Sequence, residues 1–270
     1  MKNLPTLYSR AETGAIRHWT IEVGSEGYRT IYGQVDGKTT TSQWYATKAT
    51  NVGKINERNE LDQAHFEAHA IWKKKVDAGF VIHATNVDVV KFVKPMLADK
   101  WEKREKKITY PVYSQPKLDG MRAVISRDGA FTRNGKKWVT IPHILEQLKP
   151  FFDKHPDYIL DGELYNHEYK EDFNKICSLA KKTKPTEKDL EESANKLQYW
   201  IYDIIGLDEV FSKRSEFLNE SFGSAPFVSL VVVPTVCADN KLDLDIFYND
   251  YVRDGYEGQM VRNNTPYECK

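Results

Sequence analysis

Hydrophobic and polar residues alternate through the first part of the chain in the way that is typical of strands. The alternation runs over residues 16–23 and again over residues 28–35, with a glycine-containing turn between them. Asp36-Gly37 follows at once, and this dipeptide is a strong signal for a hairpin turn. The pattern therefore predicts antiparallel strands at the start of the chain.

The hydrophobic period changes near residue 60. Apolar residues now recur every three to five positions, which predicts one buried face of a helix. That face comprises Leu61, Ala64, Ala68, Ile71 and Val76. Asn59 is suited to cap the start of this helix, and Gly79 to end it. We therefore expect a small domain of sheet plus helix at residues 1–82.

A second domain is expected at residues 83–270, entered through a linker at residues 83–108. Its predicted strands cover residues 110–114, 123–126, 130–133, 158–160, 197–205, 227–233 and 258–262. One helix is predicted to open at Thr140 and Pro142, with Ile144, Leu145, Leu148 and Phe152 facing inward, and another to cover residues 243–253. Because strands outnumber helices and the two interleave irregularly, we predict an α+β fold with mainly antiparallel sheets.

Composition limits the environment and the partners of the protein. The 270 residues include 39 basic and 39 acidic residues, so the formal net charge is zero and any nucleic-acid surface must be a local patch. The cysteines Cys177, Cys237 and Cys269 lie far apart and form no C-x-x-C pair, which excludes a cysteine-based zinc ribbon and favours a reducing compartment. No apolar run approaches the roughly 20 residues that cross a bilayer. We expect an intracellular protein, cytoplasmic or nucleoid-associated, without a membrane partner.

The segment from Lys117 to Arg122 places an amine directly after a predicted strand, where Asp119-Gly120 forms a turn that exposes it. An ordinary lysine has a pKa of about 10.4 and is a poor nucleophile near neutral pH. Burial and cationic neighbours can depress that pKa and make the amine reactive. Taken alone, the segment fits a plain surface turn better, because Asp-Gly is common in hairpins.

Four later residues supply the other groups that nucleotidyl transfer needs. Arg133 lies 16 residues after Lys117, Glu163 follows an apolar strand, Tyr202 lies in an aromatic strand and Glu257 starts a strand. They offer a cation for phosphate, a ribose acceptor, a ring for base stacking and a metal carboxylate. Each has a structural explanation too, as a core ring, a solvated charge or an exposed strand end. Their order along the chain favours one common site.

From about Met96 onward, the chain resembles the ATP-dependent DNA ligases of the covalent nucleotidyltransferase superfamily. The segment Lys117 to Arg122 matches the family pattern K-x-D-G-x-R, whose lysine forms a phosphoramidate with AMP. The resemblance implies that Lys117 is the catalytic nucleophile and that Arg122 and Arg133 contact phosphate of the nucleotide or of the nicked strand.

The resemblance assigns the remaining site residues as well. It implies that Glu163 holds the ribose, that Tyr202 stacks on adenine and that Glu257 serves Mg²⁺. The expected reaction starts with ATP, passes AMP to a 5′-phosphate at a nick in duplex DNA and ends when a 3′-hydroxyl displaces the AMP. Such joining serves DNA replication, repair or recombination.

The same resemblance implies an ATP-grasp-like antiparallel adenylation domain. Family members continue with a strand that carries two lysines and then with an OB-fold domain, and neither follows Tyr267 to Lys270 in this sequence. We therefore expect the adenylation domain to be incomplete at its C-terminal side, with the OB-fold absent. Either the sequence is a shortened one, or the remainder is a separate polypeptide or domain.

Residues 6–80 resemble a WGR domain, a small module associated with DNA binding. The match covers residues 19–23, residues 32–37 and the helix end at residues 75–80. The Trp-Gly-Arg motif itself is replaced by Tyr-Gly-Gln at residues 32–34, so its usual cation is lost. Other basic residues could contact DNA, namely Arg29, Lys38, Lys48 and Lys54. DNA contact and a mainly structural role both stay open.

Several other functions share part of this pattern. An RNA ligase or an mRNA-capping guanylyltransferase would also carry Lys117, Glu163 and Glu257. An NAD-dependent ligase is disfavoured, because the sequence lacks a nicotinamide-recognition segment rich in tyrosine and aspartate. A module that binds nucleotide or DNA without joining ends is the alternative from another functional class.

Overall fold

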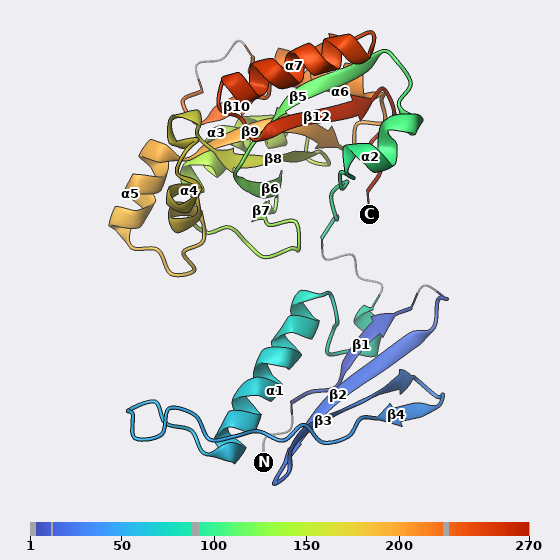
Figure 1. Ribbon diagram of the computed structural model, residues 1–270, viewed down its shortest axis with the longest axis vertical. Coiled ribbons are helices and arrows are strands. Elements are labelled where there is room, and N and C mark those ends of the chain that lie inside the picture. Colours follow the sequence, from blue (N-terminus) through green and yellow to red (C-terminus); the bar gives the residue numbers. More distant parts are fainter. Residues whose placement is uncertain (1–3, 12, 88–91, 224–226, 270) are drawn as a thin grey trace. The chain divides into compact units, whose positions relative to one another are not determined.

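The computed structural model describes residues 4–11, 13–87, 92–223 and 227–269. The chain divides into two compact units, Met1–Lys91 and Phe92–Lys270, and each is described by itself (Figure 1). This division does not test the WGR-like and adenylation assignments of the two predicted domains, which stay predictions.

The N-terminal unit contains an antiparallel sheet in the order β1-β2-β3-β4. Its strands are β1 (Leu7–Arg10), β2 (Ile16–Gly24), β3 (Gly27–Gln34) and β4 (Thr39–Thr41). The predicted hairpin turn is confirmed, since the N–H of Gly37 donates to the carbonyl of Gln34 at 3.1 Å and Asp36 has a positive φ of 63°.

Helix α1 (Glu60–Asp77) packs on one face of this sheet, over a core of Leu7, Trp19, Ile21 and Ala68. Both predicted helix ends are confirmed. The Asn59 side chain accepts a hydrogen bond from the N–H of Asp62 at 2.8 Å, and Gly79 has a φ of 95° just beyond the helix. The short 3₁₀ turn η1 (Ala84–Asn86) follows.

The predicted inner face of α1 is correct at its centre and wrong at its ends. Ala64 and Ala68 are buried and Ile71 packs against the core, but Leu61 and Val76 are exposed. Val76 lies five residues after Ile71, which turns it about 140° away from that face at 100° per residue. Leu61 belongs to the first turn, where the helix has few neighbours.

The C-terminal unit contains two sheets. The larger sheet has the order β10-β9-β8-β6-β7 and is formed by β6 (Met121–Ser126), β7 (Gly129–Phe131), β8 (Ile159–Tyr165), β9 (Gln198–Ile205) and β10 (Leu230–Val232). The smaller sheet has the order β11-β5-β12 and is formed by β5 (Val112–Lys117), β11 (Val236–Ala238) and β12 (Gly258–Asn263). The strands pair antiparallel except for β10, which runs parallel to β9, so the prediction of mainly antiparallel sheets is confirmed.

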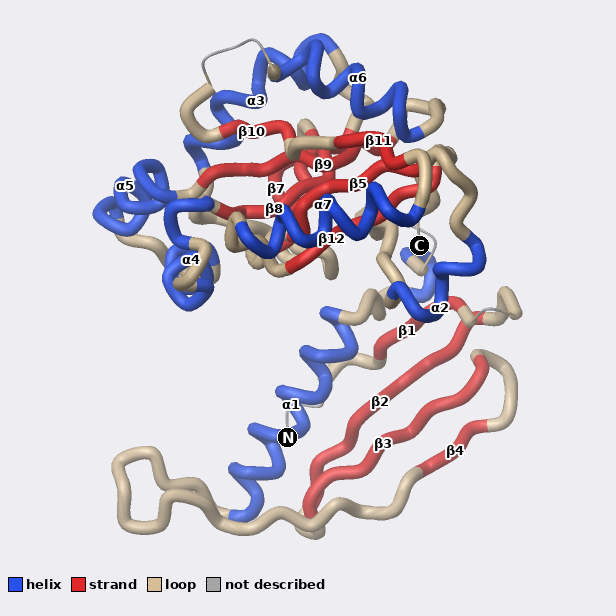
Figure 2. Tube along the Cα trace, turned by 45° about the horizontal axis from the view of Figure 1, so that its top comes forward, coloured by secondary structure: helices blue, strands red, loops and turns tan. Residues whose placement is uncertain are grey.

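Helices cover one face of each sheet (Figure 2). Side chains of α3 (Pro142–Lys154), α4 (Phe173–Ala180) and α6 (Phe211–Phe222) form the main core with the larger sheet, and α7 (Lys241–Arg253) packs on the smaller one. The other helical segments are α2 (Trp101–Arg104), η2 (Glu105–Lys107), η3 (His167–Tyr169) and α5 (Glu187–Lys196). The face of the larger sheet opposite its core helices carries the predicted site residues of β6 and β8.

The sequence pattern predicted α3 and α7 but missed α4, α5 and α6. Pro142 lies in the first turn of α3, and Ile144, Leu148 and Phe152 are buried as expected. Helix α6 escaped prediction because a charged residue, Arg214, is buried on its inner face and interrupts the apolar period. Helix α5 has few apolar residues of any period.

Candidate active site

Lys117 and Glu257 lie together at the edge of the smaller sheet. Lys117 is the last residue of β5 and pairs with Gly258 at the start of β12. The N–H of Glu257 donates to the carbonyl of Lys117 at 3.1 Å, and the Lys117 Nζ forms an ion pair with Glu257 Oε1. Both side chains are about half exposed, at 41% and 47%. The pairing of β5 with β12 therefore joins an accessible amine to a carboxylate from a distant part of the sequence.

Arg122 lies on β6 and is held by a buried carboxylate. Its Nε and Nη2 donate to the two oxygens of Asp161, at 2.9 and 2.6 Å. Burial opposes the charge on the guanidinium, but the hydrogen bond to Asp161 together with the Coulombic attraction of the acidic groups around it raises the pKa of Arg122. The cation is therefore permanent, and this paired geometry keeps it in one orientation.

Glu163 is directly opposite Arg122 in the pairing of β6 with β8. Burial raises the pKa of Glu163 from 4.5 to about 8, although the positive charges of Arg122 and Lys117 act in the other direction. A carboxyl group that exchanges its proton near neutral pH thus lies between the arginine and the lysine of the K-x-D-G-x-R segment.

This pKa predicts a pH dependence of stability. In the unfolded chain Glu163 should titrate near 4.5 and in the folded chain near 8, so between these values the folded state binds the extra proton. The contribution of Glu163 to the free energy of unfolding is then full below pH 4.5 and is lost as the pH rises to about 8. Urea unfolding at a series of pH values should show a shallower decline for Glu163→Gln than for the unchanged protein. Equal slopes would contradict the prediction.

Two glycines bring the backbones of this site close together. A Cβ atom on Gly120 would lie 2.5 Å from the carbonyl oxygen of Leu164, and one on Gly162 would lie 2.5 Å from that of Trp200. Neither position has room for a side chain. A Cβ on Gly120 would also lie 2.7 Å from the Glu163 Cγ, whereas one on Gly162 would meet the core ring of Tyr199 on the other face of the sheet.

Tyr202 is aimed at the site by an irregularity in β9. The register between β8 and β9 shifts between Asp161 and Gly162, so Tyr202 has no residue directly opposite it in β8. Such a bulge redirects side chains. The partly exposed ring lies 5.7 Å from the guanidinium carbon of Arg122 and 5.5 Å from that of Arg262. It packs on one side against a small cluster of Tyr165, Trp200 and Val233.

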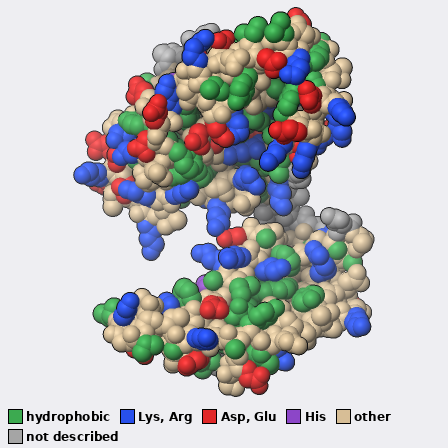
Figure 3. Space-filling view, in the orientation of Figure 1, with side chains coloured by type: hydrophobic (Ala, Val, Ile, Leu, Met, Phe, Trp, Pro, Cys, Tyr) green, Lys and Arg blue, Asp and Glu red, His purple; other side chains and the backbone are tan. Residues whose placement is uncertain are grey.

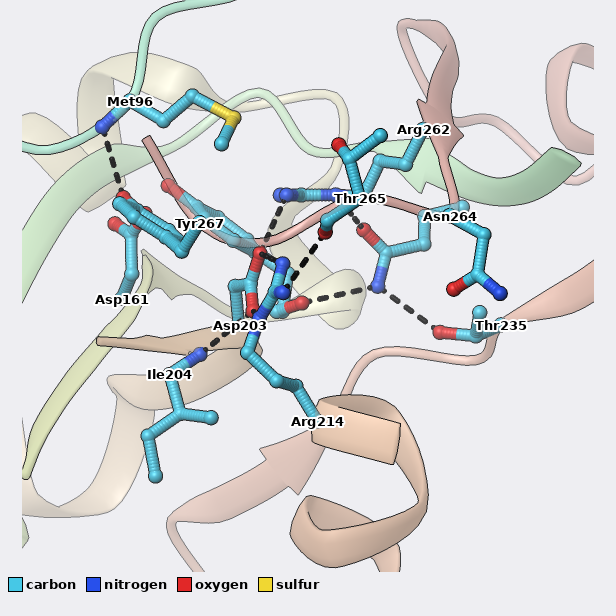
Figure 4. Close-up of polar contacts among 12 residues, drawn as sticks. Met96, Asp161, Asp203, Ile204, Arg214, Thr235, Arg262, Asn264, Thr265 and Tyr267 are labelled. Carbon is cyan, nitrogen blue, oxygen red and sulfur yellow. Dashed lines mark hydrogen bonds and ion pairs between the residues drawn. The ribbon is translucent and has the colours of Figure 1, made fainter. Parts of the chain in front are cut away.

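Asp203, the next residue, is fully buried and binds two arginines (Figure 4). Arg214 donates to both of its carboxylate oxygens, at 2.7 and 3.1 Å, and Arg262 donates at 2.7 Å. Arg262 also donates to the side-chain oxygen of Gln115 at 2.9 Å, and the Gln115 amide donates to the Tyr202 carbonyl at 3.2 Å. These bonds connect the smaller sheet to the larger one beneath the site.

Tyr267 forms a second hydrogen-bonded connection, between Asp161 and Met96, which is also visible in Figure 4. Its hydroxyl donates to Asp161 at 2.6 Å and accepts from the N–H of Met96 at 2.9 Å. Burial, followed by the negative charge of Asp161, raises the pKa of Tyr267, so this hydroxyl keeps its proton. Segments near both ends of the unit therefore meet at the carboxylate that holds Arg122.

Arg133 does not contact the other predicted site residues. It lies in an exposed turn after β7 and, among the described residues, forms no hydrogen bond or ion pair through its side chain. The structure thus brings Lys117, Arg122, Glu163 and Glu257 to one place, with the Tyr202 ring beside Arg122, but does not bring Arg133 into contact with them.

Several residues of the site were not predicted from the sequence. They are Asp161, Asp203, Arg214, Gln115, Arg262 and Tyr267. Asp161 and Arg262 lie inside the D-G-E and E-G-Q-M-V-R segments that begin or end with predicted residues, so those motifs carried a usable signal. Arg214 and Tyr267 have no local signal, because their partners are distant in the sequence.

Comparison with known proteins assigns the family. A family model described as "ATP dependent DNA ligase domain" matches residues 95–270, well over half of the chain. This chain belongs to the ATP-dependent DNA ligase domain family. The predicted family resemblance is thereby confirmed, while the WGR-like resemblance of the N-terminal unit stays a prediction.

Solved structures share the fold of the ligase domain at low sequence identity. A structure of a Lig E DNA ligase is 21% identical with a TM-score of 0.52, and the match covers 66% of this chain and 64% of that one. Two structures named Pmar-Lig_Pre and Pmar-Lig_PreS3 are 20% and 19% identical, with TM-scores of 0.54 and 0.53, and the matches cover 66% of this chain and 44% and 45% of theirs. The chain therefore spans less than two thirds of each of these structures. No curated protein matches it.

Glu257 is the residue that was predicted to serve a divalent cation, and this role stays a prediction. The described residues contain no group of three or more His, Cys, Asp or Glu side chains that could hold a metal ion by themselves. Glu257 is accessible and lies beside Lys117. Mg²⁺ is commonly bound by one or two carboxylates together with substrate phosphates, and Glu257 fits that donor set.

No helix within the described ranges is long and apolar enough to cross a membrane.

Proposed function

We propose that this chain is the adenylating part of an ATP-dependent DNA ligase and that Lys117 carries the AMP. The observation that supports this most directly is the accessible Lys117 amine, which lies beside Glu257 in a domain of the DNA ligase family. Arg122, Glu163 and Tyr202 surround the same place on the larger sheet. This arrangement suits a nucleotide whose α-phosphate meets the amine.

In the proposed reaction, the lone pair of the deprotonated Lys117 Nζ attacks the α-phosphorus of ATP. A P–N bond forms, the bond to the bridging oxygen breaks, and pyrophosphate leaves with that electron pair. The ammonium form must first separate from Glu257 Oε1, the oxygen it contacts in the structure, and release its proton to solvent water. The amine is unable to attack while it is protonated.

The other residues bind and orient the nucleotide in this proposal. The Arg122 cation is kept in place by Asp161 and faces phosphate, Glu163 accepts a ribose hydroxyl, and the Tyr202 ring stacks on adenine. Bound Mg²⁺, held by Glu257 and phosphate oxygens, would offset the charge of the triphosphate. The AMP would then pass to a 5′-phosphate at a nick in duplex DNA, and a 3′-hydroxyl would release it.

We also propose that the N-terminal unit contributes to DNA contact, as its WGR-like sequence suggests. Arg29 lies over the Trp44 ring at 4.7 Å and pairs with Glu22, so this cation is held rather than free. Exposed lysines of the unit, among them Lys48 and Lys54, remain available for phosphate.

The test is incubation of the chain with α-labelled ATP and Mg²⁺, followed by separation of covalently bound AMP. Label that is released by acid but resists denaturation would indicate a P–N bond. Incubation with labelled GTP separates a capping-type transferase from a ligase. Nucleotide binding without any covalent label would instead favour a binding module.

A further inference from the structure

Two segments of the ligase domain lie side by side and carry an excess of positive charge. Residues 132–137 and 181–188 contain seven basic residues and one acidic residue, in a chain whose basic and acidic residues are equal in number. We call these two segments the basic edge. Thr140, just after the first segment, donates from Oγ1 to the carbonyl of Ala180, just before the second, at 3.0 Å. That buried hydrogen bond fixes the two segments next to each other.

Both segments are ordered by their own hydrogen bonds. In the first, the N–H groups of Thr132 and Gly135 close a turn with the carbonyls of Lys136 and Thr132, at 2.7 and 2.8 Å. In the second, Thr186 and Asp189 form a capping box at the start of α5. The cations therefore extend from fixed backbones rather than from loose loops.

Most of the basic side chains are exposed, and several lack an acidic partner. Lys182 pairs with Asp189, but within the described part of the chain Arg133, Lys137 and Lys184 form no ion pair. Figure 3 shows Lys and Arg side chains along the border of the C-terminal unit where Figure 1 places the β7–α3 and α4–α5 connections. Grouped basic side chains that outnumber their acidic neighbours attract a polyanion.

We propose that the basic edge is a surface for the phosphate backbone of duplex DNA. Lysine is a mobile point charge that suits contacts independent of sequence, and phosphate contacts are of that kind. The predicted phosphate contact of Arg133 belongs to this surface. The proposal rests on the proposed ligase function, since that function supplies duplex DNA as the partner.

The test is the binding of the chain to a fluorescent nicked duplex at several salt concentrations. Changing Lys137, Lys181 and Lys184 together to Ala should make the slope of log K against log salt shallower by up to about 2.7, at about 0.9 for each phosphate that the variant no longer neutralises. Changing the same three lysines to Arg should restore the slope. An unchanged slope in the alanine variant would overturn the proposal.

A matched control uses three exposed lysines of the same unit outside the basic edge, Lys103, Lys106 and Lys107. Their change to Ala should leave the slope unchanged. An equally large change of slope in this control would show that any exposed lysine can contact DNA phosphate and that the basic edge is not a defined surface. Labelling of Lys117 by ATP, measured in parallel, should be the same in both variants and in the unchanged chain. Absence of label in all of them would reject the ligase function while the salt slopes still report on the surface.

A different observation concerns the turn at residues 254–257, which joins α7 to β12 and ends at Glu257. The carbonyl of Asp254 accepts from the Lys170 Nζ at 2.8 Å and contacts the His167 Nε2 at 3.1 Å. A carbonyl can only accept, so the His167 Nε2 donates. The Nδ1 atom then accepts from the hydroxyl of Tyr165, at 2.9 Å.

The His167 ring is neutral in this arrangement and forms a hydrogen bond through each of its two nitrogens. Burial, with the positive charge of Lys170, lowers the pKa of His167, which agrees with that state. The ring also stacks on Tyr256, with centroids 4.3 Å apart. Tyr256 immediately precedes Glu257, whose N–H is bonded to the Lys117 carbonyl.

The geometry points to His167 as a positioning residue for self-adenylation. Its bonds tie the turn to the end of β8, the strand that carries Glu163, and so keep Glu257 beside Lys117. This inference also rests on the proposed function. It assigns no contact with the nucleotide to His167.

The test compares two substitutions of His167. His167→Phe keeps a ring against Tyr256 but loses both hydrogen bonds, whereas His167→Gln keeps a donor for the Asp254 carbonyl. We expect kcat for self-adenylation to fall about fivefold to tenfold in the Phe variant, the value of roughly one hydrogen bond, with KM for ATP little changed. The Gln variant should recover most of the loss.

A readout that needs no activity is hydrogen exchange of residues 254–258, which should be faster in His167→Phe and near normal in His167→Gln. Tyr256→Phe is the control, because it retains the stacked ring. If exchange and kcat of the Phe variant match the unchanged chain, His167 does not position the turn. A chain that never accepts AMP, with the exchange pattern as expected, would reject the ligase function alone.

Discussion

Lys117→Ala is expected to abolish covalent AMP formation. The substitution removes the amine that lies beside Glu257. The carboxyl groups of Glu257 and Glu163 have no nitrogen and cannot form a P–N bond. Folding should be almost unchanged, because an exposed ion pair contributes at most about 1 kcal/mol. The measurement is the label assay described above together with urea unfolding.

Lys117→Arg makes a sharper control for this assignment. The guanidinium keeps a positive charge beside Glu257 but does not lose its proton near neutral pH, so it should bind nucleotide without accepting AMP. Peptide mapping of the unchanged chain should locate the label at Lys117. Label on a different lysine would show that the assignment is wrong.

Asp203→Ala should produce the largest loss of stability. The carboxylate is fully buried, and its removal would leave the guanidinium of Arg214, itself 1% exposed, and that of Arg262 without their counter-charge. Breaking a buried pair on one side typically costs about 3–5 kcal/mol. Urea unfolding measures this loss directly, and nucleotide binding should weaken with it because Gln115 and Tyr202 belong to the same bonded group.

The exposed pair of Lys213 and Glu216 provides the matched control on the same helix as Arg214. Glu216→Ala should change the free energy of unfolding by no more than about 0.5 kcal/mol. If Asp203→Ala were as mild as this control, the buried network would not be what joins the two sheets.

Local patterns in the sequence were sufficient for much of this structure. Alternation located β2 and β3, and Asn59 and Gly79 marked both ends of α1. The K-x-D-G-x-R segment located Lys117 and Arg122 before any geometry was known. These features depend on residues that are close in the sequence, and their physical causes are therefore readable there.

The features that were missed depend on residues far apart in the sequence. Asp161 pairs with Arg122 across 39 positions and with Tyr267 across 106, and no periodicity indicates such partners. The bulge that aims Tyr202 comes from a register shift between two strands, which a single strand does not reveal. Charged residues in the core, such as Arg214, are also hard to predict, because charged residues usually lie at the surface.

The close backbone approach at Gly120 and Gly162 has a consequence for the redesign of nucleotide choice. Any larger residue at either position would collide with a main-chain carbonyl of the neighbouring strand, at Leu164 or Trp200. Gly120 and Gly162 would therefore have to remain glycines in any redesign of this site. New selectivity would have to come from side chains such as Tyr202, which lies beside Arg122.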